Sequence, residues 1–133
     1  MELKQRLSDL GMFKSRCLAI IGKGCLSKEV AFLCSEHGLK VFFFTDKYTG
    51  DDEDSIKFIP LEEGKGENRW TCLKSLSLII ILSCSEGILE EILFSAIPFC
   101  RIIIIGPIGG ILYNMDFYST VHIKNLELIF LPL

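Results

Sequence analysis

A glycine pair follows the first apolar run of the chain, in the order Ile21-Gly22-Lys23-Gly24-Cys25-Leu26-Ser27. In a glycine-rich turn between a strand and a helix, the first glycine permits the tight turn and the second lets a pyrophosphate approach the backbone. The helix that follows offers unpaired N–H groups and the positive end of its dipole. Ser27 replaces the third glycine of such a turn, which weakens the motif without abolishing it, because serine is small. The turn predicts phosphate binding.

An acidic residue follows the second apolar run, and Asp46 lies twenty-four residues after Gly22. A carboxylate at the end of that strand can accept hydrogen bonds from the hydroxyls of an adenosine ribose, and its charge repels a 2′-phosphate. This position favours NAD over NADP, and we include the neighbouring Lys47 in the candidate site. The alternative is that Asp46 only caps the loop that follows.

The elements that must position these residues are indicated by apolar runs that are continuous rather than alternating. Such runs are typical of parallel strands covered on both faces. They occupy residues 17–21, 40–44, 76–82, 101–105 and 126–131, with a weaker run at 56–60. Helical patterns occupy residues 27–37, with Gly38 as a stop signal, and residues 86–96. The alternation predicts one α/β domain over residues 1–133, a Rossmann-like three-layer sandwich around a mostly parallel six-stranded sheet.

Three further segments resemble the cofactor-binding (Rossmann) domain of the medium-chain alcohol, sorbitol and threonine dehydrogenases. Residues 76–87 are similar to that family's fourth strand and its small-residue turn, residues 100–110 to its fifth strand and glycine-bearing loop, and residues 116–129 to its short helix and sixth strand. The resemblance implies NAD as cofactor, with Cys84 and Gly106 beside it. No segment resembles the GroES-like domain that carries the family's catalytic zinc and proton relay.

The predicted cofactor site therefore has members from four places in the chain, and no catalytic or metal-ligating residue is predicted. Its members are Gly22, Lys23, Gly24, Cys25, Leu26, Asp46, Lys47, Cys84 and Gly106.

These residues leave three functions open, and whether the chain is part of an enzyme is also open. The first is a stand-alone NAD(P)-type nucleotide-binding module, such as one subunit of a split oxidoreductase that meets a separate catalytic subunit. The second is a non-catalytic interaction or scaffold protein, and the third is a sensor of nucleotide or redox state. Gly22, Gly24 and Asp46 favour the first, whereas Ser27 and the missing catalytic domain favour the second.

Charge and hydropathy exclude other classes of function. A formal net charge of −3 does not indicate the excess of positive charge that binding to nucleic acid requires. No apolar run approaches the ~20 residues that span a bilayer, and residues 1–10 lack the apolar region of a signal peptide. We therefore expect a cytoplasmic protein without nucleic-acid or membrane partners. The six cysteines are expected to be reduced and buried, and the pair Cys34 and His37 is too small a set for zinc.

The last apolar run, residues 126–131, predicts how the protein assembles. The resemblance places this strand at a sheet edge, where it pairs with its twofold mate. An uncovered apolar edge is an aggregation hazard that a soluble protein must pair, cover or blunt. We expect a homodimer through this strand and the preceding residues 113–122.

Overall fold

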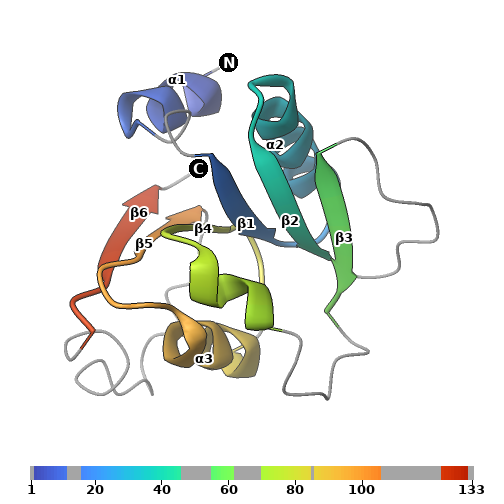
Figure 1. Cartoon of the computed structure of the whole chain (residues 1–133). Coiled ribbons are helices and arrows are strands. Elements are labelled where there is room, and N and C mark those ends of the chain that lie inside the picture. Colours follow the sequence, from blue (N-terminus) through green and yellow to red (C-terminus); the bar gives the residue numbers. More distant parts are fainter. Residues whose placement is uncertain are drawn as a thin grey trace.

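Six strands form one sheet at the centre of the part of the chain that the structure describes (Figure 1). The computed structural model describes residues 2–11, 16–45, 55–61, 70–84, 86–105 and 124–131. The strands are β1 (Cys17–Ile21), β2 (Lys40–Thr45), β3 (Ile56–Pro60), β4 (Leu78–Ile81), β5 (Arg101–Ile105) and β6 (Glu127–Leu131). The helices are α1 (Glu2–Asp9), α2 (Cys25–Glu36) and α3 (Glu86–Ser95), with a 3₁₀ helix, η2 (Thr71–Ser75).

The strand order is β3-β2-β1-β4-β5-β6, and every neighbouring pair is parallel. The chain moves outward from β1 through β2 to β3, and then crosses back to β4 on the other side of β1. From there it continues outward through β5 to β6. The direction of winding therefore reverses between β1 and β4.

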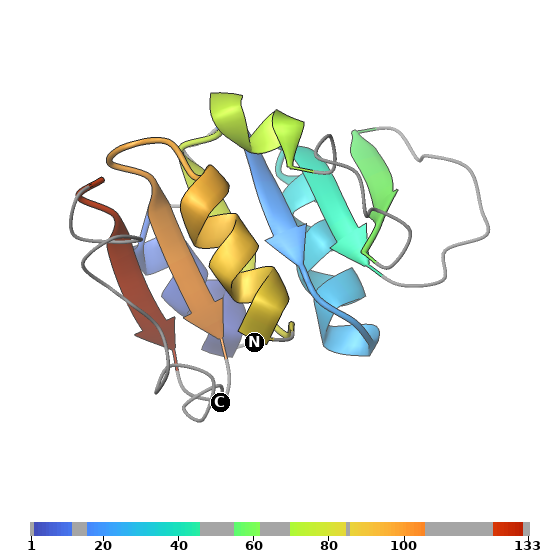
Figure 2. The ribbon, with the colours of Figure 1, turned by 90° about the horizontal axis from the view of Figure 1, so that it is seen from below.

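Helices cover both faces of the sheet, so the predicted three-layer sandwich is confirmed (Figures 1 and 2). Successive side chains of β1 enter different layers, because side chains alternate along a strand. Leu18 and Ile20 pack in the layer that contains residues of α1 and α2. Ala19 and Ile21 pack in the layer that contains residues of η2 and α3.

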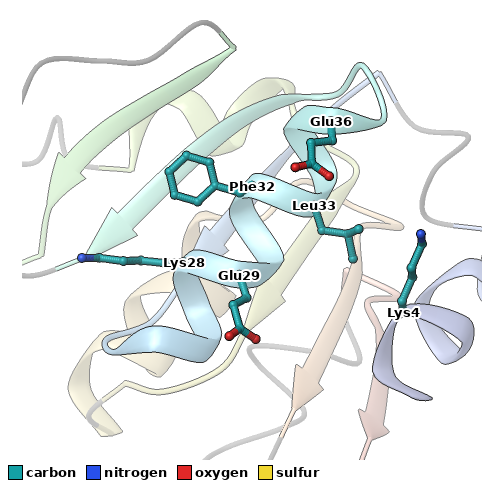
Figure 3. A pocket seen from close by; sticks show the side chains of 6 residues that line it. All are labelled: Lys4, Lys28, Glu29, Phe32, Leu33 and Glu36. Atoms are coloured by element: carbon teal, nitrogen blue, oxygen red, sulfur yellow. The ribbon is translucent and has the colours of Figure 1, made fainter. Parts of the chain in front are cut away.

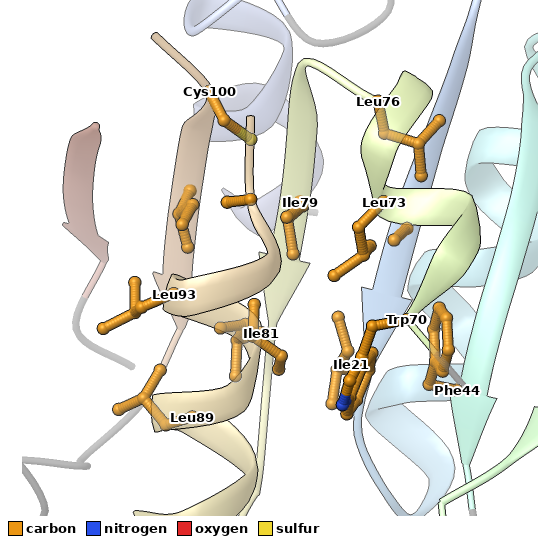
Figure 4. Close-up of a cluster of buried hydrophobic side chains, with 14 of the residues drawn as sticks. Ile21, Phe44, Trp70, Leu73, Leu76, Ile79, Ile81, Leu89, Leu93 and Cys100 are labelled. Carbon is orange, nitrogen blue, oxygen red and sulfur yellow. The ribbon is translucent and has the colours of Figure 1, made fainter. Parts of the chain in front are cut away.

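An aromatic pair extends the α3 layer across β2 (Figure 4). The ring centroids of Phe44 and Trp70 lie 4.8 Å apart, and Trp70 is buried. The indole Nε1 of Trp70 donates to Glu91 Oε1 on α3 over 3.3 Å. Trp70 thus packs η2 and α3 against the same side of the sheet.

The strands and helices expected from the apolar and helical patterns are confirmed, with shifted bounds at five of them: α2, β2, β4, α3 and β6. The short helix expected before β6 lies outside the described residues. The helix predicted from residue 27 begins at Cys25, and β4 is shorter than residues 76–82 at both ends. Gly38, with a φ of +83°, follows α2 in the left-handed conformation that favours glycine, as the stop signal predicts. The sequence analysis did not anticipate α1. Arg101 Nη1 donates over 2.7 Å to the carbonyl oxygen of Leu10, the residue that follows this helix. No helix in the described ranges is long and apolar enough to cross a membrane.

All six cysteines lie in described segments and none forms a disulfide, but their burial differs. Cys34 and Cys100 are buried, as expected, and three others are half-buried. The expectation of burial is wrong at Cys25, which is exposed because it begins α2 at the edge of the sheet. Burial raises the pKa of the Cys34 thiol from its ordinary value of 9.0 to about 12.

We predict that Cys34 makes the fold sensitive to alkali. Because the pKa of Cys34 is raised in the folded state, its thiol stays neutral there while the unfolded chain ionises above pH 9.0. The contribution to stability is therefore complete below pH 9.0 and is lost as the pH rises towards 12. At pH 10.5, wild type should have lost about 2 kcal/mol more of its free energy of unfolding than Cys34→Ala has.

Urea unfolding at pH 7 to 10.5 measures this difference. Cys34→Val is the control, because it lacks the thiol but fills the site differently. The Ala and Val variants should differ from each other in stability at pH 7. They should share one pH dependence, less steep than that of wild type because the Cys34 thiol is absent while the buried thiols of Cys84 and Cys100 remain. Identical pH dependence in wild type and both variants would contradict the prediction.

Candidate functional site

The glycine turn lies at the carboxyl edge of the sheet, where the direction of winding reverses. Gly22 N–H donates to Phe44 O of β2 over 3.0 Å, and Leu82 N–H donates to Ile21 O of β1 over 2.8 Å. These two bonds hold the end of β1 between the ends of β2 and β4. In open parallel sheets, ligands bind in the crevice at this reversal, outside the carboxyl ends of the strands.

Gly22 and Ser27 pack directly against each other, and this contact fixes the approach of α2 to β1. A Cβ added to Gly22 would lie 2.3 Å from Ser27 Oγ and 3.1 Å from Leu82 Cβ. Ser27 is 1% exposed, and its hydroxyl donates to Lys23 O over 3.2 Å. Serine is thus accommodated in the third glycine position, because Gly22 has no side chain and the backbone carbonyl oxygen of Lys23 accepts a hydrogen bond from the serine hydroxyl.

Gly24, the N-cap residue just before α2, has a backbone conformation that residues with side chains rarely adopt, with φ +92° and ψ −176°. No side chain caps this end of the helix, so its first N–H groups have no partner of that kind. A Cβ added to Gly24 would meet no atom within 4 Å. Gly24 and Cys25 are exposed and Leu26 is half-buried. The backbone here is therefore open to an approaching anion.

The end of β4 supplies a residue that the sequence analysis missed. Ser83 Oγ accepts the backbone N–H of Lys23 over 2.9 Å, between residues sixty positions apart. Cys84, the next residue, is half-buried, and burial raises the pKa of its thiol to about 11. That thiol is neutral at pH 7. The signal available in the sequence was the small-residue turn after the fourth apolar run.

The structure brings six of the nine predicted site residues to one edge. Gly22 to Leu26 form one turn, and the Lys23–Ser83 hydrogen bond places the segment that contains Cys84 beside it. The other three, Asp46, Lys47 and Gly106, lie outside the described residues. Thr45 and Ile105, which precede them, end β2 and β5 at this same edge. Within the described ranges, no three His, Cys, Asp or Glu side chains gather to hold a metal.

Two grooves are lined entirely by described residues, one between α1 and α2 and the other between Trp70 and α3. One, of about 470 Å³, surrounds Phe32 on α2 with charged side chains of both signs; it is lined by Lys4, Lys28, Glu29, Phe32, Leu33 and Glu36 (Figure 3). The other, of about 380 Å³, is lined by Trp70, Gly87, Glu90, Glu91, Phe94 and Ser95. Neither contains a residue of the predicted cofactor site.

Comparison with known proteins gives structural neighbours only. No family model matches the chain, and no curated protein matches it. A D-isomer-specific 2-hydroxyacid dehydrogenase from Lactobacillus delbrueckii ssp. bulgaricus, in its NAD-complexed form, superposes with a TM-score of 0.61 at 16% identity, covering 90% of this chain and 37% of that one. This chain has a Rossmann-like fold.

Two further dehydrogenase structures superpose similarly. D-lactate dehydrogenase with NAD⁺ from Lactobacillus jensenii has a TM-score of 0.59 at 16% identity, over 90% of this chain and 36% of that one. For D-2-hydroxyisocaproate dehydrogenase the TM-score is 0.59 at 14% identity, over 92% of this chain and 39% of that one. The chain thus spans less than two fifths of the length of these neighbours. The expected Rossmann domain is confirmed as a fold.

We predict that Gly22→Ala destabilises the Rossmann-like domain through its contact with Ser27. The added methyl has no room beside Ser27 Oγ and Leu82 Cβ, and overpacking of this kind costs about 1–3 kcal/mol. The double variant Gly22→Ala/Ser27→Gly should recover part of the loss. Urea unfolding at pH 7 measures all the free energies of unfolding.

The matched control is Gly87→Ala on α3, where an added Cβ meets no atom within 4 Å. That variant should be stabilised by about 0.5–1 kcal/mol, because alanine favours a helix over glycine. A Gly22→Ala protein as stable as wild type would show that the contact with Ser27 does not exclude a side chain at position 22. A double variant whose free energy of unfolding is no higher than that of Gly22→Ala would show the same.

Proposed function

We propose that this chain is the nucleotide-binding module of an oxidoreductase and binds NAD at the carboxyl edge of its sheet. The observation that carries the proposal is the uncapped first turn of α2, open at Gly24 and located at the β1–β4 reversal. The NAD complexes among the structural neighbours support it, since their dehydrogenases share the fold. NAD supplies hydride transfer when bound.

The residues of the glycine turn fit the pyrophosphate of a dinucleotide. The N–H groups of Gly24, Cys25 and Leu26 belong to the first turn of α2, where the helix dipole also favours an anion. Asp46 is proposed to accept hydrogen bonds from the adenosine ribose and to disfavour a 2′-phosphate. Lys47, Cys84 and Gly106 complete the proposed site.

The catalytic groups are proposed to come from outside this site. Beside the turn, burial raises the pKa of the Cys84 thiol to about 11, which makes this group a poor base or nucleophile at pH 7. A separate catalytic subunit, or another part of a longer polypeptide, would provide the acid or base. Kinship with the medium-chain dehydrogenases remains part of this proposal.

The fit of Ser27 weakens the alternative of a scaffold protein that has lost its ligand. In the sequence, the serine at the third glycine position was the residue that favoured this alternative. In the structure the serine is buried, hydrogen-bonded to Lys23 and matched to Gly22. The substitution therefore leaves the turn intact for a ligand.

We also propose that β6 joins two copies of the chain in an isologous homodimer. Among the described strands, β6 has β5 as its one neighbour. The opposite edge, β3, carries an exposed Lys57 and an exposed Pro60, which blunt an edge against pairing. By contrast, β6 presents Phe130, whose side chain is 49% exposed. The other expected interface segment, residues 113–122, lies outside the described residues.

We predict that NAD protects Cys25 from alkylation. Cys25 is exposed in the turn that would hold the pyrophosphate, so bound dinucleotide should slow its reaction with N-ethylmaleimide at least tenfold at saturation. Peptide mapping by mass spectrometry measures the rate at each thiol. Cys17 is the internal control, because it begins β1 at the opposite edge of the sheet and should react at the same rate with and without NAD.

An unchanged rate at Cys25 in millimolar NAD would contradict the proposed function. The assay uses the wild-type chain, which avoids substituting Gly24. Because Gly24 has a φ of +92°, a variant such as Gly24→Val would strain the backbone and lower stability as well as block a pyrophosphate.

We predict that Phe130→Lys dissociates the homodimer. Phe130 is half-exposed on the edge strand, so a lysine there costs the monomer little and places like charges together across a twofold contact. Light scattering should give twice the monomer mass for wild type and the monomer mass for the variant. Phe94→Lys, at a 54% exposed position on α3, should remain dimeric. A monomeric wild type would refute the assembly.

A further inference from the structure

The peptide groups on both sides of Lys23 are tied to other parts of the fold. Its N–H donates to Ser83 Oγ over 2.9 Å, and its C=O accepts from Ser27 Oγ over 3.2 Å. Ser83 follows β4 and Ser27 lies in α2, so the two serines connect the turn to the end of β4 and to α2. The residue they hold is itself exposed.

The Ser83 bond decides which N–H groups of the turn a ligand can use. A turn of this kind presents several successive N–H groups, and the one of Lys23 is already satisfied inside the protein. Those left for an anion are the groups of Gly24, Cys25 and Leu26, at the start of α2. A hydroxyl that accepts one hydrogen bond still has its own proton to donate.

We propose that Ser83 is the positioning residue of the nucleotide site, which rests on the proposed function. By holding Lys23 N–H, it fixes the turn before a ligand arrives, so that binding does not have to order the backbone. It also links the ends of β1 and β4, across which a dinucleotide lies in this architecture. The turn that Ser83 positions would bind the phosphate portion of the nucleotide through the N–H groups of Gly24, Cys25 and Leu26.

The experiment compares Ser83→Ala with Ser83→Thr by calorimetric titration with NAD, well below the melting temperature of each variant. Ser83→Ala should raise the Kd for NAD about tenfold, which corresponds to about 1.4 kcal/mol. Ser83→Thr keeps the hydroxyl and should restore the wild-type Kd to within about threefold, the uncertainty of one such bond. Hydrogen exchange should show Lys23 N–H protected in wild type and in Ser83→Thr, and unprotected in Ser83→Ala.

The matched control is Ser75→Ala, which removes a serine hydroxyl that also hydrogen-bonds to the backbone but lies in η2: exposed Ser75 donates to Cys72 O over 3.0 Å. Its Kd should equal that of wild type. Equal Kd values for wild type and Ser83→Ala would overturn the role of Ser83 and leave the nucleotide site standing. A weakening of the same size in Ser75→Ala would also overturn it. No binding of NAD to wild type at millimolar concentration would overturn the nucleotide site and this inference together.

Discussion

Every strand of this sheet has to bury side chains on both of its faces, because all the neighbouring pairs are parallel and helices lie above and below. The chain meets this requirement by sending α2 to one face after β1 and α3 to the other face after β4 (Figure 2). The connection from β1 to α2 and the connection from β4 to α3 therefore leave the same edge of the sheet in opposite directions. The reversal at that edge is thus a consequence of covering both faces of the sheet, and in this architecture ligands bind at such a reversal.

Close packing of α2 on β1 then determines the chemistry of the turn. Gly22 has to lack a side chain because Ser27 occupies the space beside it. The same turn brings Gly24 and the start of α2 to the surface, where their N–H groups face no side-chain cap. Five of the six cysteines lie in segments that are buried or half-buried, which makes their thiols poorly reactive. Cys25, in the turn, is the one exposed cysteine of the six. Packing and the proposed phosphate recognition thus depend on the same few residues.

The sequence predicted the strands well because parallel, doubly covered strands are continuous apolar runs, and β1 and β5 have the predicted bounds. It missed α1, a largely polar helix, for which the leucines at positions 3 and 7, and at position 10 just after it, were the available signal. It also missed Ser83, because a contact between residues sixty positions apart depends on strand order. The fit of Ser27 could not be predicted for the same reason: it depends on the distance between α2 and β1, which a motif does not contain.

The central claim is that a dinucleotide binds at the carboxyl edge rather than in a groove on the outside of a helix. Backbone amide chemical shifts of the ¹⁵N-labelled chain, followed through a titration with NAD, test it most directly. The account predicts that the largest changes occur at Gly24, Cys25 and Leu26, with a second group at Ser83 and Cys84. Changes confined to the groove around Phe32, or no changes at millimolar NAD, would contradict it.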